Sequence, residues 1–564
     1  MFSKIKIVFI FIIVCNFEAS AQSMFQLSVI QTDSSEIKFL TRNKFQQKHK
    51  TKESLNDELF FIINKLQNNG YISASFDSVK YDSLQVKAFI YSGQQYVLLN
   101  NPFENIDENI LRRNNLKTKN FAGKILQYNE ILKNIEKIVT YYENNGFPFA
   151  EVRAQEIFVD TNSLFFYLKV TENQFYRIDS IILKGEPIIS KNYLEHYLNI
   201  STNDIYNESE IQKIENRLKN SEFLNEIRTA DIEFSPTQAA LFLYLEKKKS
   251  NRFDGIAGIM TNNKTDSKII LTGNVNLLLF NSFKRGEKLQ FNWERTESQS
   301  QRLVLNLGYP YFFKTALGID YRFELQKNDS SFIRLQNLFN LQYFSGGNNY
   351  ISAFYEKRSS FPLPSATSLS ELATVKSQLW GFSFFTENLD NKYNPRKGYS
   401  ISARLGLGTR LADTLQSENM WEAQLSGFVF YPMLSAFAIK FEVQGKYLKT
   451  NTLYQNELYR FGGMKTLRGF NEDEFFASQF LIGIVELRYL FEEKSYFSLF
   501  YNLAYYQQPT SYNTITDFPQ GFGTGVSFFT NSGIFSVGYS LGKQFDNKID
   551  MKSAKIYFGY VNTF

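Results

Sequence analysis

The sequence is poor in cysteine and histidine, and each scarcity argues against particular kinds of functional site. A single cysteine, Cys15, and two histidines, His49 and His196, occur among 564 residues. Cys15 lies in an amino-terminal segment that we expect to be removed, so the mature chain is expected to have no cysteine. Disulfide staples, thiolate metal sites and cysteine nucleophiles are then excluded. Two histidines in separate segments also argue against a zinc site.

No catalytic pattern accompanies these histidines. Neither stands with a G-x-S-x-G-like nucleophile turn. The clustered carboxylates Glu472, Asp473 and Glu474 could bind a cation, but a solvated run of loop charges is the favoured interpretation. We therefore expect a protein that is not an enzyme and that has no cofactor and no metal.

Long apolar runs are absent beyond the first residues. The segment MFSKIKIVFIFIIVCNFEASAQ carries two lysines, an apolar run from Ile7 to Cys15, and a small-residue cleavage signal before Gln22. A run of about nine residues is roughly half of what a membrane-spanning helix needs. Residues 1–21 are therefore predicted to be a secretory signal peptide, with a membrane anchor as the less favoured alternative.

Aromatic residues, by contrast, are abundant. The chain has 57 Phe and 34 Tyr, and aromatics make up 17% of it, yet its mean hydropathy is slightly polar. A β-barrel in an outer membrane reconciles the two, because its strands alternate lipid-facing apolar with lumen-facing polar residues and aromatics ring both interfaces. The net charge of +6 is small for this length, and export makes nucleic acid an unexpected partner.

The amino-terminal part repeats. KLQNNGYISASF (65–76) returns as YYENNGFPFAEV (141–152) and more faintly as RLKNSEFLNEI (217–227), and the aromatics Tyr71, Phe147 and Phe223 are each 76 residues apart. Each copy is expected to have a helix before the break and two strands after it, an α+β arrangement. The copies resemble POTRA modules, with expected boundaries 22–98, 99–174 and 175–250.

The remaining residues, 251–564, follow a strand pattern. KLQFNWER alternates Leu289, Phe291 and Trp293 with polar residues, and about sixteen such segments predict an all-β transmembrane barrel of antiparallel strands. Short connections fall after even-numbered strands and the long ones after odd-numbered strands. The stretch TLRGF (466–470) is therefore predicted to lie in the sixth outer loop, between strands eleven and twelve.

The last strand carries aromatic residues on one face. Phe558, Tyr560 and Phe564 alternate along IYFGYVNTF. A final strand that ends in Phe resembles the β-signal by which outer-membrane barrels are recognised for assembly. An interface role for these rings is compatible with that interpretation.

Three local patterns extend the resemblance to the BamA/TamA superfamily of outer-membrane assembly proteins. The first is FGG followed by Leu467-Arg468-Gly469-Phe470, the second is Asp390-Asn391-x-x-Asn394-Pro395-x-x-Gly398 before strand nine, and the third is Glu486-Leu487-Arg488 in strand twelve. The resemblance spans essentially the whole mature chain. It implies a location in the outer membrane of a Gram-negative bacterium, with the amino-terminal modules in the periplasm.

The resemblance also implies a role for Arg468. In that family the sixth loop folds back into the lumen and its arginine contacts the inner wall, which makes Glu486 and Asn502 possible partners of Arg468. The family often has an acidic residue and a glycine in strand thirteen, where this chain has Asn502 and Ala504. A guanidinium offers a rigid fork of donors for such a contact. The alternative is a solvated loop arginine.

The implied function is the folding and insertion of outer-membrane proteins. Edges of the POTRA-like sheets would accept client strands by β-augmentation, and the barrel would open between its first and last strands, where Gly255, Gly258 and Gly559 weaken the seam. Expected partners are unfolded outer-membrane clients, outer-membrane lipids and periplasmic or lipoprotein accessory subunits. The alternative is a two-partner-type secretion channel that exports one protein. A passive porin would explain neither the repeats nor the loop motif.

Overall fold

A computed structural model describes residues 24–33, 45–116, 120–186, 189–236, 238–261, 269–295, 300–328, 331–364, 371–392, 394–413, 416–434, 436–492, 495–509, 513–530, 533–545, 547 and 549–561. The predicted signal peptide, 1–21, lies outside these ranges. The chain divides into two compact units, between Tyr176 and Arg177. Within the described ranges, no helix combines the length and the apolar character needed to cross a membrane.

The first unit begins with a four-stranded sheet and one helix. Its strands pair in the order β2-β1-β4-β3, and Thr51 caps the helix by accepting a hydrogen bond from the Ser54 backbone N–H. Leu55, Leu59 and Ile62 face the sheet from one side of the helix and are buried. The elements are β1 (Phe25–Gln31), β2 (Lys48–His49), α2 (Lys52–Gln67), β3 (Ser75–Asp82) and β4 (Gln85–Tyr91).

A second module of the same kind follows in this unit. Its sheet has the order β5-β7-β6, and its core joins Ile131 and Ile138 of α4 to Leu168 of β7. The sheet starts at Val97, just before the boundary expected after residue 98. The elements are β5 (Val97–Leu98), α3 (Glu108–Arg113), α4 (Tyr128–Glu143), β6 (Glu151–Asp160) and β7 (Ser163–Thr171).

The second unit opens with the third module. Its strands pair in the order β8-β10-β9, and Leu241, Leu243 and Leu245 of the central strand alternate into the core. Ile214 and Leu218 of α6 are also buried, so the predicted helix presents its apolar face inward. The elements are β8 (Ile178–Gly185), α5 (Lys191–Leu198), α6 (Glu208–Lys219), β9 (Leu224–Phe234) and β10 (Ala239–Lys247).

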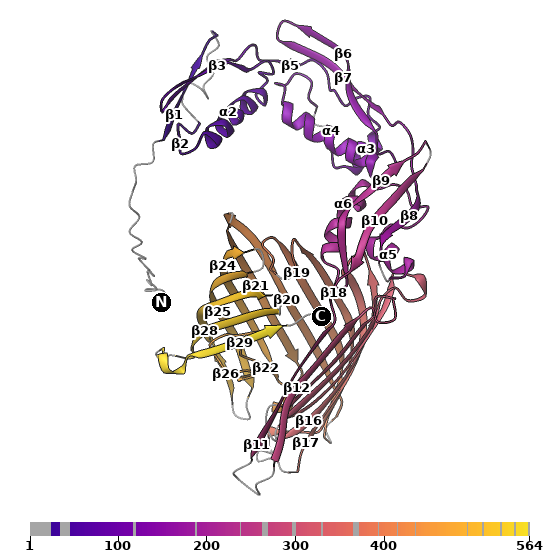
Figure 1. The fold of residues 1–564 in the computed structure, drawn as a ribbon, viewed down its shortest axis with the longest axis vertical. Coiled ribbons are helices and arrows are strands. Elements are labelled where there is room, and N and C mark those ends of the chain that lie inside the picture. Colours follow the sequence, from indigo (N-terminus) through magenta and orange to yellow (C-terminus); the bar gives the residue numbers. More distant parts are fainter. Residues whose placement is uncertain are drawn as a thin grey trace. The chain divides into compact units, whose positions relative to one another are not determined.

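One continuous antiparallel sheet forms most of the rest of this unit (Figure 1). Its strands are β11 (Arg252–Thr261), β12 (Ile269–Phe280), β13 (Lys288–Arg295), β14 (Gln301–Tyr309), β15 (Leu317–Asn328), β16 (Phe332–Phe344), β17 (Tyr350–Pro362), β18 (Val375–Leu389), β19 (Gly398–Ala412), β20 (Glu418–Leu434), β21 (Phe437–Lys449), β24 (Gln479–Glu492), β25 (Ser495–Pro509), β26 (Thr514–Asp517), β27 (Gln520–Thr530), β28 (Gly533–Lys543) and β29 (Lys555–Val561).

The 17 strand segments of this sheet correspond to sixteen strands among the described residues. β26 and β27 both pair with β25 in one unbroken register, because Tyr506 opposes Asp517 and Leu503 opposes Gln520. The two segments are therefore one strand, interrupted where Pro519 cannot donate to the ladder. The predicted fold class, α+β modules followed by an antiparallel barrel, is confirmed.

Side chains alternate across the barrel wall with the period of two that strands impose. On β24, Leu481 and Val485 are exposed on the outer face, whereas Ile482 and Ile484 are buried inside. On β25, Leu499 is 60% exposed and its neighbour Phe500 only 7%. The outer face is thus apolar, as a lipid-facing surface requires.

The third module packs against the short turns of the barrel. Asn220 donates a side-chain hydrogen bond to the Leu389 carbonyl oxygen at 3.0 Å, and Lys392 forms an ion pair with Glu222 at 2.5 Å. Asp390 accepts backbone hydrogen bonds from Asn391 and Arg396. The Asp390 to Gly398 motif therefore shapes a turn that receives the module.

Candidate functional site

The long connection between β21 and β24, residues 450–478 and here called loop six, enters the barrel. It contains η3 (Gln455–Glu457) and a short hairpin of β22 (Tyr459–Phe461) and β23 (Phe475–Ala477). Phe461, Leu467 and Phe470 of the loop are buried in one cluster with inward-facing residues of β24 and β25. Because these three apolar side chains are buried against the inner wall, the loop is packed inside the lumen.

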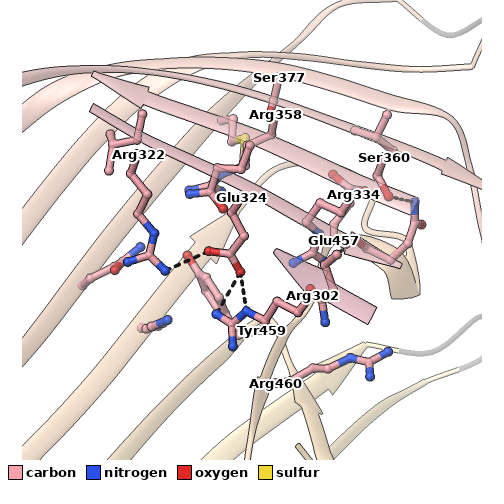
Figure 2. A pocket seen from close by; sticks show the side chains of 18 of the residues that line it. Arg302, Arg322, Glu324, Arg334, Arg358, Ser360, Ser377, Glu457, Tyr459 and Arg460 are labelled. Atoms are coloured by element: carbon pink, nitrogen blue, oxygen red, sulfur yellow. Dashed lines mark hydrogen bonds and ion pairs between the residues drawn. The ribbon is translucent and has the colours of Figure 1, made fainter. Parts of the chain in front are cut away.

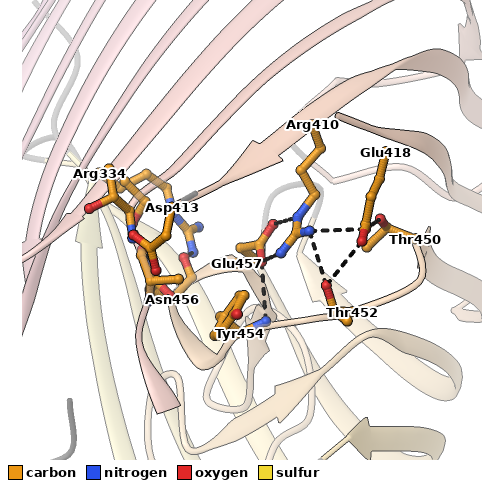
Figure 3. A network of polar contacts seen from close by, with 12 residues as sticks. Arg334, Arg410, Asp413, Glu418, Thr450, Thr452, Tyr454, Asn456 and Glu457 are labelled. Carbon is orange, nitrogen blue, oxygen red and sulfur yellow. Dashed lines mark hydrogen bonds and ion pairs between the residues drawn. The ribbon is translucent and has the colours of Figure 1, made fainter. Parts of the chain in front are cut away.

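A buried arginine holds the start of loop six (Figure 3). Arg410 of β19 has no exposed side-chain surface and donates from Nε and Nη2 to the two carboxylate oxygens of Glu457, at 2.6 and 2.5 Å. Its Nη1 donates to Glu418 at 3.1 Å and to Thr452 at 3.3 Å. This bidentate geometry is the strongest form of a carboxylate–arginine contact.

The neighbouring Asn456 adds a second attachment. Its Nδ2 donates to Ser360 Oγ and to the Ala373 carbonyl oxygen, both at 2.8 Å, and Asn456 is fully buried. Arg334 of β16 donates to the Asn456 carbonyl oxygen. The start of loop six is thus fixed to the wall formed by β16 to β19.

The tip of loop six is fixed to the opposite part of the sheet by Arg468. Its Nη1 donates to Glu486 at 2.8 Å, its Nη2 donates to Asn502 Oδ1 at 3.4 Å, and its guanidinium carbon lies 3.6 Å from the centre of the Phe500 ring. The structure thus brings Arg468 together with both of its possible partners. The ring contact adds a cation–π interaction that the sequence did not suggest.

Glu486 lies between two guanidiniums. Its second oxygen accepts a hydrogen bond from Arg488 Nε at 2.7 Å, and Arg488 itself stacks on Tyr496 at 4.2 Å. The three charged groups carry one excess positive charge. The buried Asn502 side-chain nitrogen has no acceptor among the described residues, so the amide serves the arginine with its oxygen alone.

Glycines let the loop backbone lie directly on the wall. Gly469 has φ of 103°, a conformation that disfavours other residues. A Cβ on Gly521 of β27 would lie 1.8 Å from the Arg468 carbonyl oxygen, and one on Gly542 of β28 would lie 2.6 Å from the Gly469 carbonyl oxygen. The loop and the two strands therefore approach to a distance that only glycine permits.

The last strand also holds the tip. The Gly469 backbone N–H donates to the Tyr557 hydroxyl at 3.2 Å, and that hydroxyl donates to the Phe470 carbonyl oxygen at 2.8 Å. Tyr557 lies on the inward face of β29. Loop six is thus hydrogen-bonded to a terminal strand of the barrel sheet.

The FGG stretch forms the turn that presents the arginine. Gly462 and Gly463 have φ of 124° and 90°, and Thr466 Oγ1 accepts from the Gly462 N–H at 2.8 Å. Glu472 accepts a hydrogen bond from the Met464 backbone N–H at 2.8 Å. The carboxylate of Glu472 therefore has a structural partner within its own loop.

The sheet ends at β11 on one side and β29 on the other, and no ladder joins these strands in the described part of the chain. Gly255 and Gly258 oppose Val275 and Thr272 of β12, and Gly559 opposes Ser536 of β28. The two sets of seam glycines are thus not paired with each other.

The predicted β-signal divides between described and undescribed residues. Phe558 and Tyr560 are exposed on the outer face of β29, at 78% and 47%. Phe564 lies outside the described residues.

Sequence reasoning missed several residues of this site. Arg410, Glu457 and Tyr557 fix loop six although none stands in a recognisable motif, and Gly521 and Gly542 are ordinary strand glycines in the sequence. The alternation of inward and outward positions could have placed Tyr557 in the lumen, since it lies between the outward Ile556 and Phe558. Nothing in the sequence pairs it with loop six.

Two models of known protein families match this chain. The model of the POTRA family, described as a surface antigen variable number repeat, matches residues 176–252. The model of the Omp85 superfamily domain matches residues 281–564, half of the chain. The chain belongs to the Omp85 superfamily. The resemblance to BamA/TamA proteins inferred from the loop motif is thereby confirmed at the level of the superfamily.

Two solved structures of CdiB share the fold at low identity. CdiB from Escherichia coli is 11% identical with a TM-score of 0.53, over 91% of this chain and 97% of that chain. CdiB from Acinetobacter baumannii is 14% identical with a TM-score of 0.52, over 84% and 89%. BamA from Haemophilus ducreyi lacking POTRA domains 1–3 is 15% identical with a TM-score of 0.43, over 84% and 99%. A search of curated proteins found no match.

Membership of the Omp85 superfamily indicates where the barrel is located. Barrels of this superfamily lie in outer membranes, and the exposed apolar outer face of this one agrees with that location. The lumen then holds loop six as an internal element, fixed at its start by Arg410 and at its tip by Arg468.

Proposed function

We propose that this Omp85 protein folds and inserts β-barrel proteins into the outer membrane by opening between β11 and β29. The observation that carries the proposal is the absence of a ladder between these terminal strands in the described part of the sheet. Every other neighbouring pair in the barrel is joined by backbone hydrogen bonds, so separation here costs the least.

Loop six supports this lateral route. It fills part of the lumen with Phe461, Leu467 and Phe470, so it obstructs transport along the barrel axis. It is also bonded to β29 through Tyr557. Movement of the last strand would therefore be coupled to the position of the loop, because the two share these hydrogen bonds.

The periplasmic modules would receive the client. The strand β6 is an edge of its sheet, and Ile157, Phe158 and Val159 near its end are all at least 50% exposed. A long apolar edge with free backbone groups is a template for an added strand. We expect unfolded outer-membrane proteins to bind here in extended form before they reach the barrel.

No covalent step is part of this function, and no cofactor or metal is needed. The proposed partners are client barrels, the lipids around the exposed aromatic rings of the outer face, and accessory subunits in the periplasm or attached to the membrane. The three modules would extend into the periplasm, since the third packs on the turn before β19, which is a short-turn end of the barrel.

Depletion followed by quantitative proteomics of the outer membrane tests this proposal. We expect many barrel proteins to fall together and to recover on expression of the wild-type chain. Unchanged levels of all outer-membrane barrels after complete depletion would refute the assembly function.

The alternative is a two-partner-type channel that exports one protein. The observation in its favour is the charged inner wall, where Arg302, Arg322 and Glu324 line a cavity of about 310 Å³. In that case depletion would remove one protein from the medium and leave the barrel proteins in place. The same experiment therefore separates the two functions.

A further inference from the structure

A cavity lies between loop six and the inner wall, and most of the charged residues that line it are cations (Figure 2). It has a volume of about 310 Å³, which is at the lower end of the range of small-molecule sites, roughly 300–1,000 Å³. The wall side comes from β14 to β21 and the other side from loop six. The charged residues of its lining are Arg302, Arg322, Glu324, Arg334, Arg358, Arg404, Lys446, Glu457, Arg460 and Asp473.

Some of these cations already have carboxylate partners. Glu324 accepts from Arg302 and Arg322, both at 2.8 Å, so that one carboxylate serves two guanidiniums. Behind the cavity, the buried Glu356 and Glu422 hold Arg358 and Arg404. Glu457 is occupied by Arg410. Of the carboxylates that line the cavity, only Asp473 is then left for the remaining cations of the described residues, and it forms no ion pair with them within 4.0 Å.

Three further cations have no carboxylate oxygen within 4.0 Å among the described residues, namely Arg334, Lys446 and Arg460. Their side chains have only neutral partners. Arg334 donates to a backbone carbonyl oxygen, Arg460 donates to Asn328 at 2.8 Å, and the Lys446 ammonium lies 5.2 Å from the centre of the Tyr459 ring. Enclosed cations that lack a directly paired carboxylate are costly.

Two residues that line the cavity also carry donors without an acceptor in the described part of the chain. The Tyr459 hydroxyl and Arg404 Nε are buried and have no hydrogen-bond acceptor among the described residues. Both residues line the cavity. An acceptor of several hydrogen bonds that also carries negative charge would satisfy these donors and the three cations together.

We propose that this cavity binds a phosphate-bearing anion that bridges loop six and the barrel wall. Guanidinium groups donate paired hydrogen bonds to phosphate oxygens. A group that carries two or more negative charges can neutralise several cations at once. Tyr459 and Arg460 would contact the anion from the loop, and Arg334, Arg404 and Lys446 from the wall.

The bridge has a consequence for loop six. Arg460 on the loop and Arg334 on the wall repel each other when the cavity holds no anion. A bound anion replaces this repulsion by attraction to both sides, so it stabilises the docked loop by ordinary linkage. The anion would thereby set how readily the lumen element moves.

The test uses the full-length protein in maltoside micelles free of phospholipid. Inorganic pyrophosphate is titrated calorimetrically and in thermal unfolding, against sodium chloride at equal ionic strength. We expect saturable binding and a higher unfolding temperature with pyrophosphate alone. In the double variant Arg334→Gln/Arg460→Gln we expect the affinity to fall by about tenfold or more, the usual effect of losing charged hydrogen bonds.

Matched variants keep the test decisive. Lys440→Gln removes another lumen cation, one that already pairs with Glu442, and should bind as the wild type does. Lys446→Gln is the second test variant should the double variant fail to fold. Dihexanoyl phosphatidic acid is a second probe, and binding of this lipid without pyrophosphate binding would assign the site to a lipid headgroup.

Specific binding of either pyrophosphate or phosphatidic acid supports the proposed site, whereas two results would overturn it. One is an equal response to chloride at the same ionic strength, and the other is unchanged pyrophosphate affinity in the folded test variants. Neither result bears on the assembly function, which depletion tests without reference to this cavity.

Discussion

Removal of the Arg468 guanidinium should free the tip of loop six and leave the barrel intact. In Arg468→Ala the tip loses the 2.8 Å ion pair with Glu486 and the ring contact with Phe500. A hydrogen bond between charged groups contributes about 1.5–3 kcal/mol, and a cation–π contact about 0.5–2 kcal/mol. Docking should therefore weaken by roughly 2–5 kcal/mol, which corresponds to about 30- to 4,000-fold in the docked-to-free ratio.

Backbone hydrogen exchange of the peptide covering residues 461–474 measures this ratio. The amides of Gly463 and Gly469 are hydrogen-bonded in the docked loop, so their exchange reports its opening. Protection should fall by the factor given above, while amides of the β24 ladder keep theirs. Arg468→Lys should recover only part of it, because an ammonium keeps the charge and loses the planar fork.

A control and a double-mutant comparison complete this prediction. Lys465→Ala makes the same charge change in the same loop at an exposed side chain and should leave protection unchanged. Glu486→Gln should cost less in the Arg468→Ala background than in the wild type, since the shared contact is already gone. Wild-type protection in Arg468→Ala would refute the docking role and return Arg468 to a solvated loop arginine.

Three further outcomes follow from the same geometry. Gly521→Ala should displace the loop, because the new Cβ meets the Arg468 carbonyl oxygen. Gly483→Ala on β24 has open space around it and should exchange as the wild type does. Tyr557→Phe leaves two backbone groups of the loop unpaired, so protection of the same peptide should fall by about 1–3 kcal/mol while the boiled and unboiled protein still migrate differently on gels. Burial raises the pKa of Glu210, but hydrogen bonds from Lys213, Asn199 and Arg217 outweigh it and hold the pKa below its ordinary value. The resulting stabilisation is present above the unfolded pKa of about 4.3 and is lost as the pH falls through the lower folded value. The third module should therefore unfold at a lower temperature in acid, and Glu210→Gln should reduce that pH dependence.

The sequence was most informative where a period repeats. The segment that forms β13 alternates Leu289, Phe291 and Trp293 with polar residues, and such alternation predicted the strands of the barrel. The 76-residue spacing of Tyr71, Phe147 and Phe223 likewise predicted a repeated module. Both signals depend on local backbone geometry, which is why one chain suffices to show them.

Contacts between distant segments could not be predicted in the same way. Arg410 and Glu457 are 47 residues apart, and Tyr557 meets a loop that lies 88 residues earlier in the chain. Register and sheet curvature decide which inward side chains meet across a lumen, and neither is encoded in a local period. Glu486 was found only because the loop motif resembles a family in which the arginine contacts the wall.

The measurement that tests the account most directly is a disulfide lock of the seam. The mature chain is expected to have no cysteine, so cysteine pairs can be scanned between β11 and β29 without background. The control pair is Ser536→Cys/Gly559→Cys across β28 and β29, where a Cβ on Gly559 lies 3.6 Å from that of Ser536, within the usual disulfide range of about 3.5–4.5 Å.

Opening between β11 and β29 predicts a specific difference between these two locks. Client insertion into outer-membrane vesicles should stop when the seam pair is oxidised, resume on reduction, and continue in the oxidised control pair. Undiminished insertion by a fully oxidised seam pair would contradict lateral opening.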